Sequence, residues 1–142
     1  MKKILVAVDG SESSKKAAKE AADFADPGSH IFLINVVTGL VEIPEKTNPT
    51  VKEIMEKNKE ELIKKSQKIL DEAAGLFAEK DLKVEKKIKD GNPADIICEF
   101  AEKEDCDIIV LADKGKGIKR FLLGSVSDKV VRHAKKTVMV VK

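Results

Sequence analysis

The chain has 142 residues, the length of one ordinary domain, and we expect a single domain spanning residues 1–142. Charged residues make up 37% of the sequence, but both signs are interspersed and the formal net charge is only +2. A basic nucleic-acid-binding protein carries a larger one-sided excess of charge, and base-stacking surfaces need aromatic residues, of which Trp and Tyr are absent here. We therefore expect no nucleic-acid partner.

The N-terminal segment contains Met1-Lys2-Lys3, a short apolar run and then Asp9. Because this run is too short for a signal peptide or a membrane span, we expect a cytoplasmic protein that has no membrane partner. Cys98 and Cys106 are then expected to be reduced thiols, and neither lies in a metal-type cluster of ligands.

The first half of the chain alternates apolar runs with helical patterns. Lys3–Val8 and His30–Val37 are expected strands, and a helix that begins near Ser11 lies between them. One face of this helix consists of small residues that let it lie close to a sheet, namely Ala17, Ala18, Ala21, Ala22 and Ala25. Thr38–Thr50 is expected to be irregular, as a lid, a partner surface or a plain linker.

The middle of the chain is expected to hold a long helix, an edge strand and a third helix. The long helix runs from about Val51 to Lys80, and its apolar stripe comprises Leu62, Ile69, Ala73, Leu76 and Phe77. Lys83–Lys89 mixes Val and Ile with Glu and Lys, which is typical of an edge strand. The third helix has a clear start, because Asn92 can cap it and Pro93 suits the first helical position. Its inward-facing residues are Ala94, Ile97, Phe100 and Ala101.

The last third of the chain is expected to contain the strands Asp107–Ala112 and Thr137–Val141, with a helix between them. This helix begins near Ser125, and Ser125 and Asp128 have the spacing of a capping box, with Asp in place of the usual Glu. Its buried side comprises Val126, Val130, Val131 and Ala134.

Alternating strands and helices predict an α/β fold, an open parallel five-stranded sheet with helices on both faces. Ile4–Val8 and Ile108–Ala112 are nearly continuous apolar runs, as expected of central parallel strands. Right-handed crossovers then favour the strand order 3-2-1-4-5. This order leaves the apolar strand Thr137–Val141 at an edge, which either a partner chain or the helices cover.

The best candidate site is the point where the strand order reverses, between the first and fourth strands, because ligands of open parallel sheets bind there. Asp9-Gly10-Ser11 and the loop Ala112–Ser125 meet at this point. Gly124 lets the backbone approach a ligand closely, and the N–H groups of the helix that follows suit phosphate. The loop is also basic, since it carries Lys114, Lys116, Lys119 and Arg120.

Each part of this site also has a simpler interpretation. The loop can be a solvated basic connection in which Ser125 only caps a helix, and it lacks the Gly-Lys-Ser/Thr of a P-loop. Asp9 can contact a ribose or a base, bind a metal, or serve only as a turn residue before the helix.

Catalytic arrangements are poor. Ser125 and His133 are eight residues apart on one helix, roughly 12 Å along its axis, so with Asp128 they cannot form a triad. No carboxylate pair and no positioned base is apparent in the site, so we expect no defined enzymatic turnover and at most a weak ATPase.

The whole chain resembles the universal stress protein family. The stretch from Lys3 to Glu12 is similar to the family's opening strand and turn, and Gly91–Ile97 to its turn into the third helix. Leu122–Ala134 is similar to its most recognisable block, and Val138–Val141 to its closing strand.

This resemblance implies a Rossmann-like fold and a homodimer paired through the last strand, Thr137–Val141. It also implies a regulatory protein of the stress response that binds ATP, with Mg²⁺ or Mn²⁺ as an accompanying ion. The family's nucleotide motif is Gly, two residues, Gly, nine residues and then Gly-Ser/Thr. Gly124-Ser125 matches its end, whereas Ala112 stands at the first glycine and Gly115 leaves a spacer of eight residues.

The family's adenine-side positions correspond to Ala7, Asp9 and Val36, and its frequent histidine before Val36 is Asn35 here. The nucleotide-binding residues implied by the resemblance are Ala7, Asp9, Val36, Leu111, Ala112, Gly115, Gly124, Ser125, Val126 and Ser127. Two functions follow from the same fold, an adenine-nucleotide-binding regulator or a dimeric interaction protein that binds no nucleotide.

Overall fold

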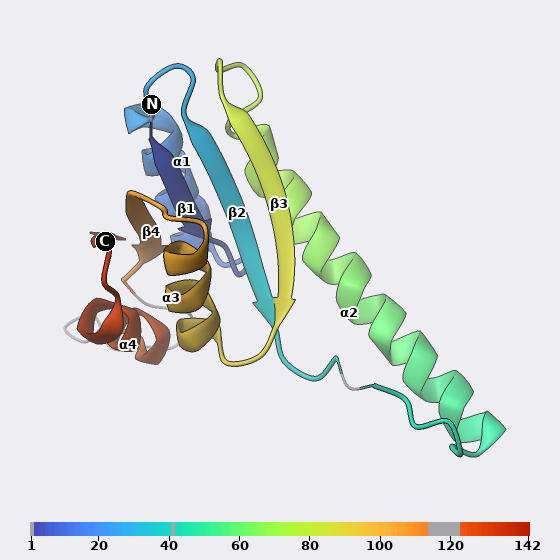
Figure 1. The fold of residues 1–142 in the computed structure, drawn as a ribbon. Coiled ribbons are helices and arrows are strands. Elements are labelled where there is room, and N and C mark those ends of the chain that lie inside the picture. Colours follow the sequence, from blue (N-terminus) through green and yellow to red (C-terminus); the bar gives the residue numbers. More distant parts are fainter. Residues whose placement is uncertain (1, 41, 114–122) are drawn as a thin grey trace.

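The computed structural model describes residues 2–40, 42–113 and 123–142. In chain order, the elements are β1 (Lys3–Ala7), α1 (Glu12–Phe24), β2 (His30–Val37), α2 (Pro49–Gly75), β3 (Lys83–Asp90), α3 (Pro93–Lys103), β4 (Ile108–Ala112), α4 (Ser125–His133) and β5 (Thr137–Val141) (Figure 1). The strands form one parallel sheet in the order β3-β2-β1-β4-β5. The predicted fold class and strand order are therefore confirmed.

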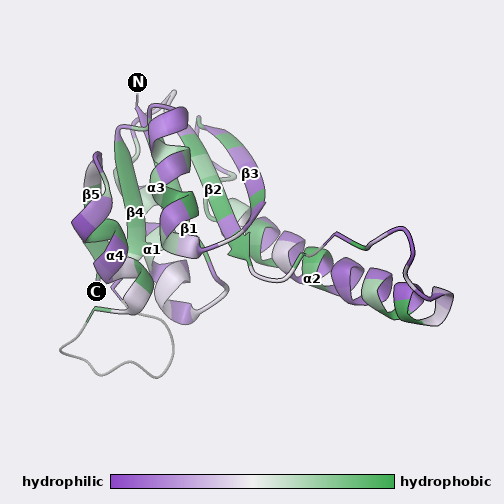
Figure 2. Cartoon of the chain, turned by 60° about the horizontal axis from the view of Figure 1, so that its bottom comes forward, coloured by the Kyte–Doolittle hydropathy of each residue, from purple (hydrophilic) through white to green (hydrophobic). Residues whose placement is uncertain are grey.

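Two layers of helices bury the two faces of the sheet. The face covered by α1 and α2 packs Ile4, Val6, Ile31, Leu33 and Val110 against Ala17, Ala21, Leu70 and Phe77. The opposite face, covered by α3 and α4, packs Leu5, Phe32, Ile34 and Ile109 against Ile97, Phe100 and Val130. Figure 2 shows the hydrophobic colour along β1, β2 and β4, the strands that both layers enclose. Burial on both faces explains why the central strands are continuous apolar runs rather than alternating ones.

The starts of α1 and α3 follow the local chemistry of their sequences. Ser11 caps α1, because its side chain accepts the Ser14 N–H over 3.1 Å. Asn92 caps α3 in the same way, by accepting the Asp95 N–H over 3.2 Å, and Pro93 follows it. Both caps satisfy a backbone donor that the first helical turn leaves free.

Helix α2 begins earlier and ends earlier than the sequence pattern predicts. Asn48 accepts the Thr50 N–H over 2.9 Å and Pro49 starts the helix, so the expected irregular segment is two residues too long. The helix ends at Gly75, and the chain then turns until Lys80. The C-cap residue Leu76 keeps a right-handed helical conformation, with φ −69° and ψ −17°, and its N–H donates to the Ala73 carbonyl over 3.1 Å.

The apolar stripe of α2 differs from the predicted one at two positions. Leu70 is 2% exposed and lies in the core, whereas Leu76 is 39% exposed. Both Leu76 and Phe77 follow the end of the helix, and in the turn that they form Phe77 is buried in the core while Leu76 is exposed.

Two expectations for α4 are wrong. Gly124 is the N-cap of this helix and no side chain caps it, so Ser125 is its first residue and not a capping-box partner of Asp128. Asp128 instead accepts Arg132 Nε over 3.0 Å, one turn further along. Val131 is 45% exposed and lies outside the buried side of the helix.

The N-terminal half of α2 extends beyond the sheet (Figures 1 and 2). On this half, Val51 is 48% and Ile54 is 57% exposed.

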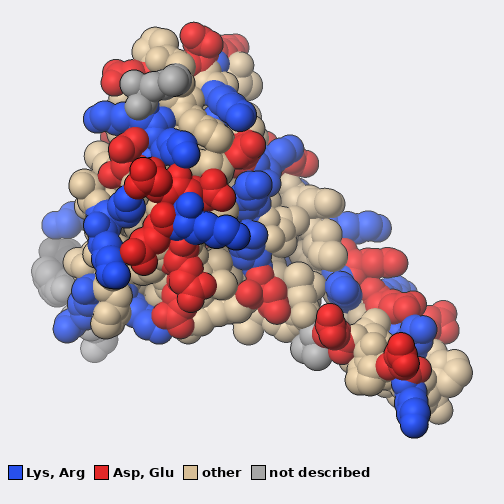
Figure 3. All heavy atoms as spheres, in the orientation of Figure 1, with Lys and Arg blue, Asp and Glu red and all other residues tan. Residues whose placement is uncertain are grey.

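Acidic and basic side chains are interspersed on the face of the molecule that Figure 3 shows. Among residues 2–40, 42–113 and 123–142, none of the helices combines the length and the hydrophobicity of a membrane span.

Candidate functional site

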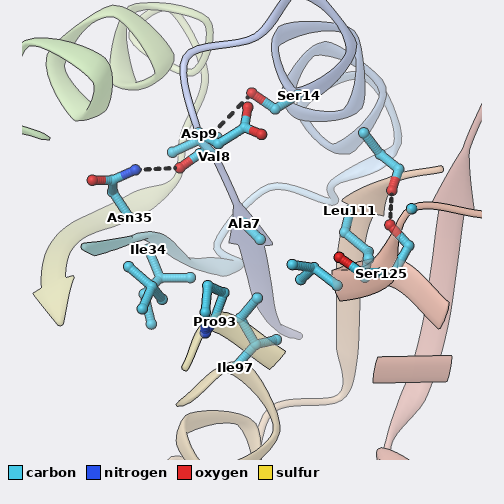
Figure 4. Close-up of a pocket in the computed structure, with 15 residues that line it drawn as sticks. Ala7, Val8, Asp9, Ser14, Ile34, Asn35, Pro93, Ile97, Leu111 and Ser125 are labelled. Carbon is cyan, nitrogen blue, oxygen red and sulfur yellow. Dashed lines mark hydrogen bonds between the residues drawn. The ribbon is translucent and has the colours of Figure 1, made fainter. Parts of the chain in front are cut away.

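A pocket of about 290 Å³ lies at the carboxyl ends of the central strands (Figure 4). Its walls come from the end of β1 with Asp9, from the ends of β2 and β4, and from the starts of α1, α3 and α4. β1 and β4 are neighbours whose connections lead in opposite directions, so this is the switch point of the sheet. Its volume lies near the lower end of the range for small-molecule sites, ~300–1,000 Å³.

The pocket brings together residues that the sequence reading had selected from distant segments. Those that line it are Ala7, Asp9, Val36, Leu111, Ala112, Gly124, Ser125, Val126 and Ser127. Gly115 lies outside the described residues, as do the loop cations Lys114, Lys116, Lys119 and Arg120.

The sequence reading missed part of the apolar wall. Ile34, Pro93 and Ile97 line the pocket together with Leu111 and Val36. The sequence pattern indicates Pro93 only as a helix start and Ile97 only as a core residue. The strand order indicates their position. β2 and β3 are parallel neighbours, so their carboxyl ends lie at the same edge of the sheet, and α3 begins at this edge shortly after β3.

Asp9 lies just after β1, and its position is held by the start of α1. Its carboxylate accepts the Ser11 N–H over 2.9 Å, and its own N–H donates to Ser14 Oγ over 3.2 Å. Partial burial raises the pKa of this carboxyl, but hydrogen bonding by Ser11 and Ser14 outweighs that effect and the net pKa is lowered. Asp9 is therefore ionised at neutral pH, an acceptor at the edge of the pocket.

The start of α4 supplies the opposite end of the pocket. At a helix start the first N–H groups have no intrahelical partner, so the amides of Ser125–Ser127 are available to an anion. Gly124 adopts φ −62°, a backbone angle that any residue can adopt. The feature of Gly124 that matters for the pocket is therefore its lack of a side chain. Its N–H donates to the Asp113 carbonyl over 2.7 Å and ties the end of β4 to the helix.

The two serines of this helix start have different surroundings. Ser127 is 5% exposed, and its hydroxyl donates to the Ala112 carbonyl over 2.5 Å. That hydroxyl proton is therefore already engaged, and Ser127 offers its backbone N–H instead. Ser125, in contrast, is exposed and lines the pocket.

Catalytic and metal-binding groups are sparse in this pocket. Asp9 is its one carboxylate among the lining residues, and residues 2–40, 42–113 and 123–142 contain no cluster of three metal-type ligands. Burial raises the pKa of the Cys98 thiol and raises that of Cys106 to about 11, so both are protonated at neutral pH. The lining suits the binding of a ligand with an apolar part and an anionic part.

The fold and the pocket define a Rossmann-like α/β protein with a ligand site at the switch point of its sheet. The family model described as "Universal stress protein family" matches residues 1–142. A curated relative, universal stress protein MJ0531 of Methanocaldococcus jannaschii, is 36% identical over 99% of this chain and 82% of its own length. The chain therefore belongs to the universal stress protein family.

Solved structures agree with this assignment. Hypothetical protein MJ0577, also from M. jannaschii, is 30% identical with a TM-score of 0.83, over 99% of this chain and 95% of that one. A universal stress protein in complex with cAMP is 25% identical with a TM-score of 0.69, over 99% and 95% of the two chains. A family protein from Arabidopsis thaliana with AMP bound is 25% identical with a TM-score of 0.70, over 100% and 92%.

Proposed function

We propose that this protein binds an adenine nucleotide in the switch-point pocket and acts as a regulator in the stress response. The observation that carries the proposal is the pairing of an apolar wall with a free helix start in one pocket. The similar structures with cAMP and AMP bound support adenine as the base.

The two ends of the pocket suit the two ends of a nucleotide. Ile34, Val36 and Ile97 form an apolar surface for the base, and the Asp9 carboxylate is an acceptor for ribose hydroxyls. The amides of Ser125–Ser127 and the Ser125 hydroxyl are donors for phosphate. We propose ATP as the physiological nucleotide, with the lysines of the loop 114–122 as further phosphate contacts.

An accompanying Mg²⁺ or Mn²⁺ is part of the proposal only as a companion of the phosphates. Mg²⁺ in nucleotide sites usually takes one or two carboxylates and otherwise phosphate and water oxygens. Asp9 lies at the nucleoside end of the described lining, so the phosphates and water would provide most of the ligands. ATP affinity measured with Mg²⁺ and then with excess EDTA tests this part.

We also propose that the protein acts as a homodimer joined through β5. β5 is an edge strand of four half-buried apolar residues after Thr137, and α4 beside it exposes Val131 at 45%. An apolar edge of this kind is a template for strand pairing with a second chain. A regulator of this kind would act through nucleotide binding and dimerisation without turnover.

The deciding experiment is nucleotide binding by the purified protein and by Gly124→Val. Nucleotide released on denaturation is identified by mass spectrometry, and ATP and AMP are titrated calorimetrically. A valine side chain at Gly124 occupies space beside the phosphate donors, so affinity is expected to fall by at least about 100-fold, or ~2.7 kcal/mol, while the fold survives. Gly75→Val is the matched control, because an added Cβ at Gly75 meets nothing within 4 Å.

Two results would contradict the proposal. No released nucleotide together with no heat at millimolar ATP would leave the dimeric interaction protein as the function. Undiminished affinity in Gly124→Val would show that the nucleotide binds elsewhere. Timed incubation with ATP then distinguishes a binder from a hydrolase.

A further inference from the structure

A buried chain of hydrogen bonds connects α2 to the nucleoside end of the pocket. Ser66 Oγ, on α2, donates to Asn35 Oδ1 over 2.5 Å. Asn35 Nδ2 in turn donates to the Val8 carbonyl over 2.8 Å, as Figure 4 shows. Ser66 is 1% and Asn35 is 6% exposed, so water does not replace either bond. Because the Val8 carbonyl can only accept, the orientation of the Asn35 amide follows from this contact.

The Val8 carbonyl lies where the backbone ladder of β1 stops. The Val8 N–H still donates to the Ile34 carbonyl over 2.9 Å, but β1 itself ends at Ala7. The Asn35 side chain therefore provides the next hydrogen bond in place of a strand neighbour. The residue held in this way immediately precedes Asp9, the carboxylate of the site.

A second contact from the same turn of α2 holds the residue after Asp9. Gly10 adopts φ +85°, and a Cβ at this position would lie 3.1 Å from Cγ1 and Cδ1 of Ile69. Ser66 and Ile69 are three residues apart, so they lie on one face of the helix. One turn of α2 thus reaches Val8, before Asp9, through the Asn35 side chain, and lies directly against Gly10, after Asp9.

We propose that Ser66 and Asn35 are positioning residues for the nucleoside end of the site. They fix Val8, and through it the Asp9–Ser11 turn, in the geometry that presents the Asp9 carboxylate to the pocket. The consequence for ligand affinity rests on the proposed nucleotide binding, whereas the effect on the turn does not.

The test compares Ser66→Ala with Ser29→Ala in the full chain. Ser66→Ala leaves the buried Asn35 Oδ1 without its donor. Ser29 is the matched control, because it is 0% exposed and its hydroxyl has no partner within the described residues. Circular dichroism and thermal unfolding establish that both variants are folded.

Two readouts separate positioning from general stability. In Ser66→Ala without nucleotide, the loss of one hydrogen bond is expected to speed amide hydrogen exchange at residues 9–11 by about 5- to 10-fold. Exchange in β3 is not expected to become faster to the same extent. Calorimetry is expected to give about 5- to 10-fold weaker binding of both adenosine and AMP. Ser125→Ala, at the phosphate end, is expected to weaken the binding of AMP but not of adenosine. Ser66→Thr keeps the hydroxyl and is expected to retain the wild-type exchange rates and affinities.

The outcomes are distinguishable. Unchanged exchange at residues 9–11 in Ser66→Ala overturns the proposal, as does faster exchange that is equal throughout the sheet. Faster exchange with unchanged adenosine affinity overturns the link to the ligand. If the wild-type protein binds neither AMP nor adenosine, the proposed function fails, and the exchange data still decide whether Ser66 positions the turn.

Discussion

Asp9 combines a local structural role with a place in the pocket. Its carboxylate accepts the Ser11 N–H, and its backbone N–H donates to Ser14 Oγ, so the same residue orders the β1–α1 turn and lines the site. Turn chemistry and ligand binding were alternatives when only the sequence was considered. In the folded chain they coexist, because the turn hydrogen bonds hold the carboxylate ionised.

The lowered pKa of Asp9 has a consequence for stability at acidic pH. A carboxyl with a folded-state pKa below its ordinary value of 3.8 stabilises the native state above that value. This contribution is lost as the pH falls through the lower, folded-state pKa. Urea unfolding between pH 7 and pH 2 is therefore expected to show a shallower acid decline for Asp9→Asn than for the wild type.

Asp26→Asn, at another exposed carboxylate, is the control for the Asp9 experiment. Its unfolding free energy is expected to follow the wild-type pH dependence. An equal decrease of the unfolding free energy at acidic pH in Asp9→Asn and in the wild type would contradict the role assigned to Asp9.

Among the helices, α2 has two parts with different functions in the fold. Its C-terminal part packs Leu70 and Ala73 on the sheet and reaches the site through Ser66 and Ile69. Its N-terminal part extends past the sheet and exposes Val51 and Ile54. Isolated helices shorter than about 12–15 residues are marginally stable in water. We therefore expect the packed C-terminal part of α2 to stabilise its extended N-terminal part.

Paired substitutions on α2 test this division. Leu70→Ala removes a side chain that is 2% exposed and is expected to lower the free energy of unfolding by about 2–5 kcal/mol. Ile54→Ala acts at a side chain that is 57% exposed and is expected to cost less than about 0.5 kcal/mol. Urea denaturation measures both, and similar losses for the two variants would show that the extended part is packed in solution.

At the scale of the whole molecule, the proposed homodimer depends on the backbone groups at the edge of β5. The Asp113 N–H donates to the Val141 carbonyl over 3.0 Å, so the backbone groups of Val141 face β4. Because the backbone groups of successive strand residues point to opposite sides, those of Val140 face the open edge. The edge thus has a free donor at Val140 for a second chain.

Val140→Pro removes this outward donor without touching the bonds to β4. Sedimentation at micromolar concentration is expected to change from dimer to monomer, while the circular dichroism spectrum is retained. Val140→Ala keeps the N–H and is expected to remain dimeric. A wild-type monomer, or a dimeric Val140→Pro, would contradict pairing through β5.

Much of this architecture is readable from local patterns. The caps at Ser11 and Asn92 and the helix start at Gly124-Ser125 each depend on a few adjacent residues. The parallel sheet follows from the alternation of strands and helices along the chain. The same Asn-Pro pattern marks the start of α2 at Asn48-Pro49, two residues before the start predicted from hydrophobic periodicity. Such features are predictable because hydrophobic periodicity and capping act within one element.

Packing between elements decided the rest. The apolar wall of Ile34, Pro93 and Ile97 exists only because separate strands end at one sheet edge beside α3. The bond between Ser66 and Asn35 joins positions 31 residues apart, and no pattern in either segment indicates it. The sequence alone established the fold, the family and the loop with Gly124-Ser125. The contacts of α2 that hold the turn around Asp9 were established only by the tertiary structure, because they depend on how whole elements pack against one another.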